Sequence, residues 1–118
     1  MFDNVLNRVL RDVDGAQCVL LAGADGVVVA AAVAKGGPAP EAVAASLADL
    51  FRKVGAAHRD AGLAPPKEFT SGSTAGQSAV RAVTPNYVLV AVLDRISSLG
   101  RTRFELRKAA ALLEPELI

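Results

Sequence analysis

The sequence predicts an α/β (α+β) sandwich in which a five-stranded antiparallel sheet is covered by helices on both faces, in the order α-β-β-α-β-β-β-α. Three segments carry apolar residues at helical spacing. Five shorter segments resemble strands, and most of the connections between them are short enough for hairpins. The chain has 118 residues, of which 52% are apolar and 21% charged. That length and hydrophobicity exclude intrinsic disorder and favour one core, so we expect a single domain over residues 1–118.

The first third of the chain predicts a helix followed by a hairpin. Apolar residues recur on one face at Phe2, Val5, Leu6, Val9, Leu10 and Val13, and Gly15 ends this helix. Strand-like runs at 18–22 and 27–30 then surround Asp25-Gly26, a dipeptide that favours tight hairpin turns.

The longest predicted helix covers residues 41–61. Its apolar stripe is formed by Val43, Leu47, Leu50, Phe51 and Val54. On a helical wheel, small residues lie away from that stripe, at Ala44, Ala45, Ala48, Gly55 and Ala56, interrupted by Arg52 and Arg59. Exposed helix faces usually carry charge, so the small residues predict a close contact with another helix. The alternative is that alanine is present only for its helix propensity.

Three strands and a helix are predicted for the second half. The run 87–93 is apolar on both sides, like the first strand, so both should be central in the sheet. The polar run 68–74 suits a sheet edge, and 77–84 lies between them in sequence. The last helix spans 99–113, with Thr102 and Glu105 at the spacing of a capping box.

Charge and cysteine content narrow the class of protein. The formal net charge of +1 gives no general attraction for nucleic acid. Cys18 is the only cysteine, which excludes an intrachain disulfide and suits a reducing compartment. The chain begins without the features of a signal peptide, and no apolar run is long enough for membrane insertion. We therefore expect a cytoplasmic protein.

No motif predicts catalysis, a cofactor or a metal site. The segment 71–78 superficially resembles a phosphate-binding loop, but Ser71 and Gln77 stand where the motif needs glycine and lysine, so a hairpin is favoured. His58 is the only histidine, and Cys18 lies within an apolar strand where a thiol is inert. We expect a protein that is not an enzyme.

Three stretches carry a resemblance to a known family. They are the hairpin Val19-Leu20-Leu21-Ala22-Gly23-Ala24-Asp25-Gly26-Val27-Val28-Val29-Ala30, the apolar strand Tyr87-Val88-Leu89-Val90-Ala91-Val92-Leu93, and Ser98-Leu99-Gly100-Arg101-Thr102-Arg103 leading into Leu106-Arg107-Lys108-Ala109-Ala110. In this order they resemble the Roadblock/dynein light chain family, in particular its bacterial MglB-like members.

The resemblance implies a profilin-like Roadblock fold with the spatial strand order 2-1-5-4-3. It also implies a homodimer in which third strands pair and the long helices pack side by side. Carried over, the dimer interface would contain Ala44, Ala48, Arg52, Gly55, Ala56, Arg59, Phe69, Thr70, Ser71 and Ser73. The family commonly binds small Ras-like GTPases, and MglB-like members promote GTP hydrolysis without supplying a catalytic arginine. Asp49 and Lys53 are candidates for binding such a partner by their surface position.

Two other hypotheses remain open. The protein could be a structural adaptor that recruits a signalling kinase, motor or filament component without a GTPase. A small-molecule sensor or enzyme of a related fold would need a polar-lined pocket, which the sequence does not indicate.

Overall fold

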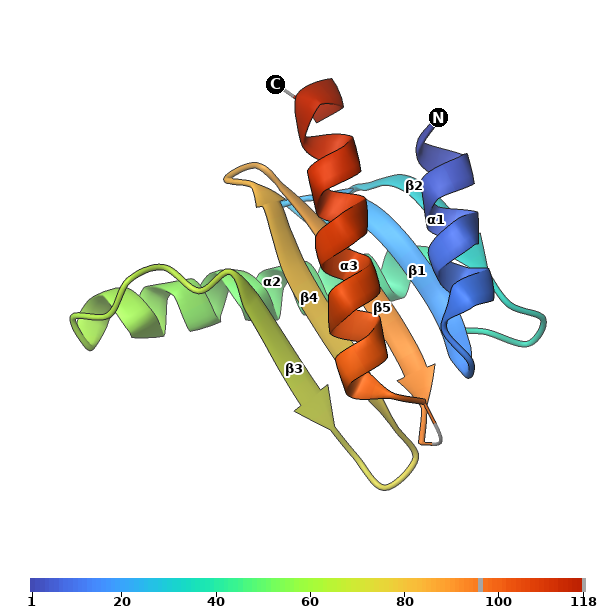
Figure 1. Cartoon of the computed structure of the whole chain (residues 1–118). Coiled ribbons are helices and arrows are strands. Elements are labelled where there is room, and N and C mark those ends of the chain that lie inside the picture. Colours follow the sequence, from blue (N-terminus) through green and yellow to red (C-terminus); the bar gives the residue numbers. More distant parts are fainter. Residues whose placement is uncertain (96, 118) are drawn as a thin grey trace.

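The computed structural model describes residues 1–95 and 97–117 of the chain (Figure 1). Its elements are α1 (Phe2–Asp12), β1 (Ala16–Gly23), β2 (Val28–Val33), α2 (Pro40–Asp60), β3 (Glu68–Gly72), β4 (Gly76–Thr84), β5 (Tyr87–Asp94), α3 (Leu99–Leu113) and a short 3₁₀ helix at Glu114–Leu117. The predicted order of helices and strands is confirmed.

The five strands form one antiparallel sheet in the order β2-β1-β5-β4-β3. As predicted, β1 and β5 are central and β3 lies at an edge. Leu20 and Val90 face each other across the β1–β5 pair, and both are fully buried. Strands covered on both faces need no polar side, which explains the uninterrupted apolar runs in these two strands.

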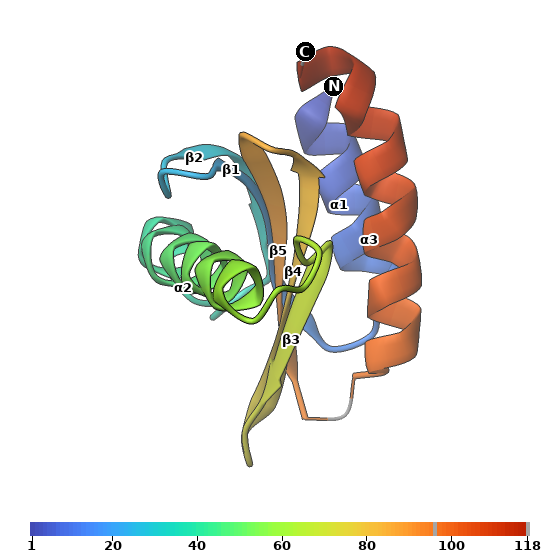
Figure 2. The same ribbon diagram turned by 90° about the vertical axis from the view of Figure 1, so that its left-hand side faces the viewer.

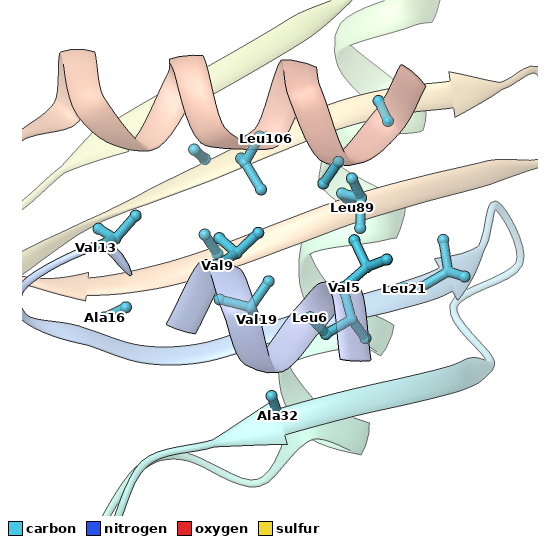
Figure 3. Packing of buried hydrophobic residues seen from close by; sticks show 14 of the residues in the cluster. Val5, Leu6, Val9, Val13, Ala16, Val19, Leu21, Ala32, Leu89 and Leu106 are labelled. Carbon is cyan, nitrogen blue, oxygen red and sulfur yellow. The ribbon is translucent and has the colours of Figure 1, made fainter. Parts of the chain in front are cut away.

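Helices cover both faces of the sheet, with α1 and α3 on one side and α2 on the other (Figure 2). The larger core lies under α1 and α3. Leu6 of α1 and Leu106 of α3 meet Val19, Leu21 and Leu89 of the central strands in this core (Figure 3). The apolar stripe predicted for the first helix therefore faces the sheet, as do the buried residues of α3.

The core under α2 corrects one prediction. Ala44 and Ala48, expected on the outer face of this helix, are 0% and 2% exposed and pack against Leu20 and Val90. Small side chains at the centre of the contact let the helix approach the sheet closely, while larger ones such as Leu47 fill the space beside it. Leu50, expected in the apolar stripe of the core, is 38% exposed.

The turn between β1 and β2 holds the N-terminal half of α2. Gly26 has a φ of +88°, and a Cβ there would come within 3.2 Å of the Cα of Ala45. Glycine is therefore needed for both the turn and the close approach. The Asp25 carboxylate accepts a hydrogen bond from the N–H of Val27 at 3.1 Å, which completes the predicted Asp-Gly turn.

The predicted capping box at the last helix is wrong. Ser98 is the N-cap of α3, and its hydroxyl accepts a hydrogen bond from the N–H of Arg101 at 3.1 Å. Thr102 lies inside the helix, where its hydroxyl donates to the Ser98 carbonyl at 2.8 Å. Glu105 is buried, with one carboxylate oxygen 3.2 Å from the Lys108 ammonium group. The spacing of Thr102 and Glu105 matched the motif one turn too late.

Candidate self-association surface

The β3 edge presents unpaired backbone groups to solvent. The N–H of Ala82 donates to the Lys67 carbonyl at 2.9 Å, so these two residues form a hydrogen-bonded pair between the chains of β3 and β4. Phe69 and Ser71 lie two and four residues after Lys67. Because antiparallel ladders alternate, Phe69 and Ser71 bond to β4, whereas Glu68 and Thr70 direct their N–H and C=O groups outward. Another strand could pair with this edge.

On the face of the sheet that α2 covers, this edge carries both apolar and polar side chains. Phe69 is opposite Val80 and Ser71 is opposite Ser78, and Val80 belongs to the core under α2. The two serine hydroxyl oxygens lie 2.5 Å apart. Ser73, predicted in this strand, lies instead in the turn to β4, where its hydroxyl accepts from the N–H groups at residues 75 and 76. The segment that resembled a phosphate-binding loop is thus a hairpin, as predicted.

On the opposite face, Glu68 connects the edge strand to its neighbours. Its carboxylate accepts a hydrogen bond from Arg81 of β4 at 2.9 Å and from the Nε of Arg103 in α3 at 2.7 Å. Burial raises the pKa of Glu68, but the bonds and charges of Arg103 and Arg81 outweigh this and hold the pKa below its usual value. This network was not predicted, because its members are separated by up to 35 residues in sequence.

The C-terminal half of α2 extends past the β3 edge (Figure 1). Only Ala44 and Ala48 of this helix are buried, so the half beyond residue 48 has no fully covered side chain. Gly55 lies in this half, and a Cβ on it would meet nothing within 4 Å. The predicted interface residues Arg52, Ala56 and Arg59 lie there as well.

The two flanks of α2 differ in chemistry. With about 100° between successive residues, Arg52, Ala56 and Arg59 share the flank of Ala45, which lies against the β1–β2 turn. The opposite flank carries Val43, Leu47, Leu50, Val54 and Ala57, which we call the α2 seam. Because the Ala45 flank lies against the β1–β2 turn, the seam lies on the other side of α2. The β3–β4 hairpin extends past the helix on that side (Figure 2). Val43 and Leu47 also pack against the core under α2, as predicted, whereas Leu50 is exposed.

Asp49 and Lys53, the residues predicted to bind a partner, form an ion pair. The Lys53 ammonium lies 3.1 Å from the Asp49 carboxylate, which also contacts Arg52. The hydrogen bond and charge of Lys53, helped by Arg52, lower the pKa of Asp49 below its usual value. Their position on the outer part of α2 leaves them accessible to another protein.

We searched the described residues for a metal site, a ligand pocket and reactive side chains. No three of their His, Cys, Asp or Glu side chains gather to hold a metal ion. Two open hollows, of about 530 and 320 Å³, are lined mainly by turn and strand residues such as Asn86 and Ser71. Burial raises the pKa of the Cys18 thiol, helped by the charge of Glu41, and His58 Nδ1 donates to the Ala64 carbonyl at 3.0 Å. Within the same residues, no helix has the length and hydropathy to cross a bilayer.

Several solved structures share this architecture. An MglB described as having a tetrameric arrangement is 25% identical, with a TM-score of 0.85 over 95% of this chain and 84% of that one. A Roadblock/LC7 domain from Streptomyces avermitilis is 15% identical, with a TM-score of 0.88 over 98% and 96% of the two chains. A profilin II from Acanthamoeba castellanii is 16% identical, with a TM-score of 0.70 over 100% of both chains.

No protein-family model matches the sequence, and no curated protein matches it significantly. The likenesses in structure confirm the profilin-like Roadblock fold, and the chain is similar to MglB and Roadblock/LC7 proteins.

Proposed function

We propose that this MglB-like Roadblock protein is a cytoplasmic homodimer that binds and regulates a small Ras-like GTPase, without catalytic residues of its own. The observation that carries the dimer is the α2 seam, an apolar stripe on a helix that overhangs an unpaired strand. Its residues follow each other at intervals of four and three, the spacing of helices that pack side by side.

The position of the seam fits a two-fold axis at β3. If two copies of β3 pair around Thr70, Glu68 of each lies opposite Gly72 of the other. Each α2 would then cross its sheet on one side of this axis, with the seam, on the flank opposite Ala45, toward the axis. The two seams then face each other over the joined sheets. This arrangement uses Leu50 and Val54 in place of Ala44 and Ala48, which are already buried within one copy.

The GTPase partner is supported by the likeness to MglB and by the resemblance of the sequence to MglB-like proteins. Joining two copies would place both overhanging α2 helices, with Asp49 and Lys53 on their outer part, on one face of the dimer. Such a surface exists only in the assembled protein, so binding of the GTPase should require the dimer.

A single variant tests both parts of the proposal. Leu50→Asp places a charge in the seam and should abolish the dimer that is held by the seam, because an unpaired charge in an apolar contact costs about 2–5 kcal/mol, and sedimentation measures this loss. Leu112→Asp, at a similarly exposed leucine on α3, is the matched control and should remain dimeric. The wild-type protein should bind the GTP-bound form of a Ras-like GTPase from the same organism and change its hydrolysis rate, and Leu50→Asp should do neither.

Two results would contradict the proposal. A wild-type protein that is monomeric at micromolar concentration has no seam-mediated dimer. A stable dimer that binds no Ras-like GTPase, while it binds a purified kinase, motor or filament component, would instead support the structural adaptor.

A further inference from the structure

The sheet has a second free edge, at β2, whose outer backbone groups are unpaired. The N–H of Ala34 donates to the Gln17 carbonyl at 2.9 Å, and Val19–Ala32 is the next hydrogen-bonded pair of that ladder. Ala31 and Val33 alternate with these residues, so their N–H and C=O groups point away from β1. In the described part of the chain, no strand pairs with β2 on that side.

Apart from one register shift at Val29, the β2 edge lacks the features that normally prevent strand pairing. Natural edge strands carry charges, prolines or strong irregularities, since an uncharged edge is a template for another strand. The strand reads Val-Val-Ala-Ala-Ala-Val, and its one register shift lies at its beginning. Val29 and Val33 are 44% and 41% exposed. At the opposite edge, by contrast, β3 carries the charged Glu68, which is paired with Arg81 of β4 and Arg103 of α3.

The exposed side chains of β2 and of its flanking turns are complementary to those of a second, antiparallel copy of the strand. Antiparallel pairing around Ala31 sets the exposed Val29 of one copy opposite Val33 of the other, with alanine at the centre. The same register brings Lys35 of each copy beside the turn that holds Asp25 of the other. Both side chains are exposed, and neither forms an ion pair among the described residues. Apolar pairs in the middle and opposite charges at both ends favour this partner over an unrelated strand.

We propose that the β2 edge is a second self-association surface, at which two copies of the chain pair antiparallel around Ala31. It is separate from the α2 seam and the β3 edge, on the far side of the sheet. A molecule with two different two-fold surfaces on opposite sheet edges adds copies at both ends. The protein then assembles beyond a dimer, into tetramers and longer even-numbered species.

Sedimentation of the wild-type protein and four variants over a range of concentration tests this surface. The wild-type protein should form species larger than a dimer as its concentration rises. Val33→Lys should stop at the dimer held by the α2 seam, and Leu50→Asp should stop at a dimer held by β2. The variant with both substitutions should be a monomer, and Leu112→Lys should behave as the wild type.

A charge reversal gives a second test that leaves the strand itself intact. Lys35→Glu places two acidic groups near each other at each end of the pair and should raise the dissociation constant of the larger species by about threefold to tenfold. Adding Asp25→Asn removes the repulsion, keeps an oxygen that can accept from Val27, and should restore much of the affinity.

The outcomes separate the two surfaces. A wild-type protein that remains a dimer at the highest concentration, and becomes a monomer in Leu50→Asp, overturns the β2 surface and leaves the proposed dimer intact. A dimer that is split by Val33→Lys but not by Leu50→Asp overturns the proposed dimer and supports β2. Lack of any rescue by Asp25→Asn contradicts the register around Ala31.

Discussion

Glu68 is the residue whose contacts connect the sheet edge with α3. Its carboxylate accepts hydrogen bonds from Arg81 and Arg103, and these arginines keep its pKa below the usual value. A carboxyl whose pKa is lowered on folding stabilises the protein above the pKa of the unfolded chain, about 4.3 for glutamate. That stability is lost as the pH falls through the lower pKa of the folded state.

We predict that Glu68→Gln lowers the free energy of unfolding by about 1–3 kcal/mol at pH 7, because two arginines lose a charged acceptor. The difference from the wild type should shrink below about pH 4 and nearly vanish once the wild-type carboxyl is protonated. Urea denaturation at one protein concentration and several pH values measures it. Glu116→Gln, at an exposed carboxyl, is the control. A loss of stability that is equal at pH 7 and pH 3 would contradict the idea that the negative charge of Glu68 is the source of the stabilisation.

The element that sequence predicted least well is α2. Its boundaries were right within one residue, yet Ala44 and Ala48 were placed on the wrong face. The periodicity of a sequence identifies the faces of a helix, but the size of the side chains alone does not show which face contacts the sheet. Close packing of a helix on a flat sheet favours small residues at the centre of the contact, so the large residues of α2 lie on a flank instead. A helix that contacts two surfaces has two apolar faces, so its pattern is ambiguous.

The placement of α2 can be tested by adding volume on each face. Ala48→Leu should destabilise the protein by about 1–3 kcal/mol, because the added atoms meet Leu20 and Val90 in a filled core. Ala42→Leu adds the same volume at an exposed position of the same helix and should leave stability nearly unchanged. Denaturant midpoints of the two variants provide the comparison. Equal midpoints would mean that the face with Ala48 is open to solvent.

At the scale of the whole molecule, local patterns were sufficient for the fold. Apolar runs placed β1 and β5 at the centre, and the polar run placed β3 at an edge. Contacts between residues distant in sequence could not be predicted from local patterns, and the ion pairs of Glu68 with Arg81 and Arg103 are an example. The surface roles of the α2 seam and the β2 edge depend on what the fold leaves uncovered. They became visible only once the core of one copy was known.

Association should also be visible in the stability of the whole molecule. If folding and dimerisation are coupled, mass action adds about 1.4 kcal/mol to the apparent free energy of unfolding for each tenfold rise in protein concentration. We therefore expect the urea midpoint of the wild-type protein to rise with concentration, and that of Leu112→Asp to rise in parallel. The double variant Leu50→Asp with Val33→Lys, which lacks both surfaces, should unfold at a midpoint independent of concentration. A wild-type midpoint that is constant over a hundredfold range would show that one copy is stable without its partner, and that neither surface contributes to folding.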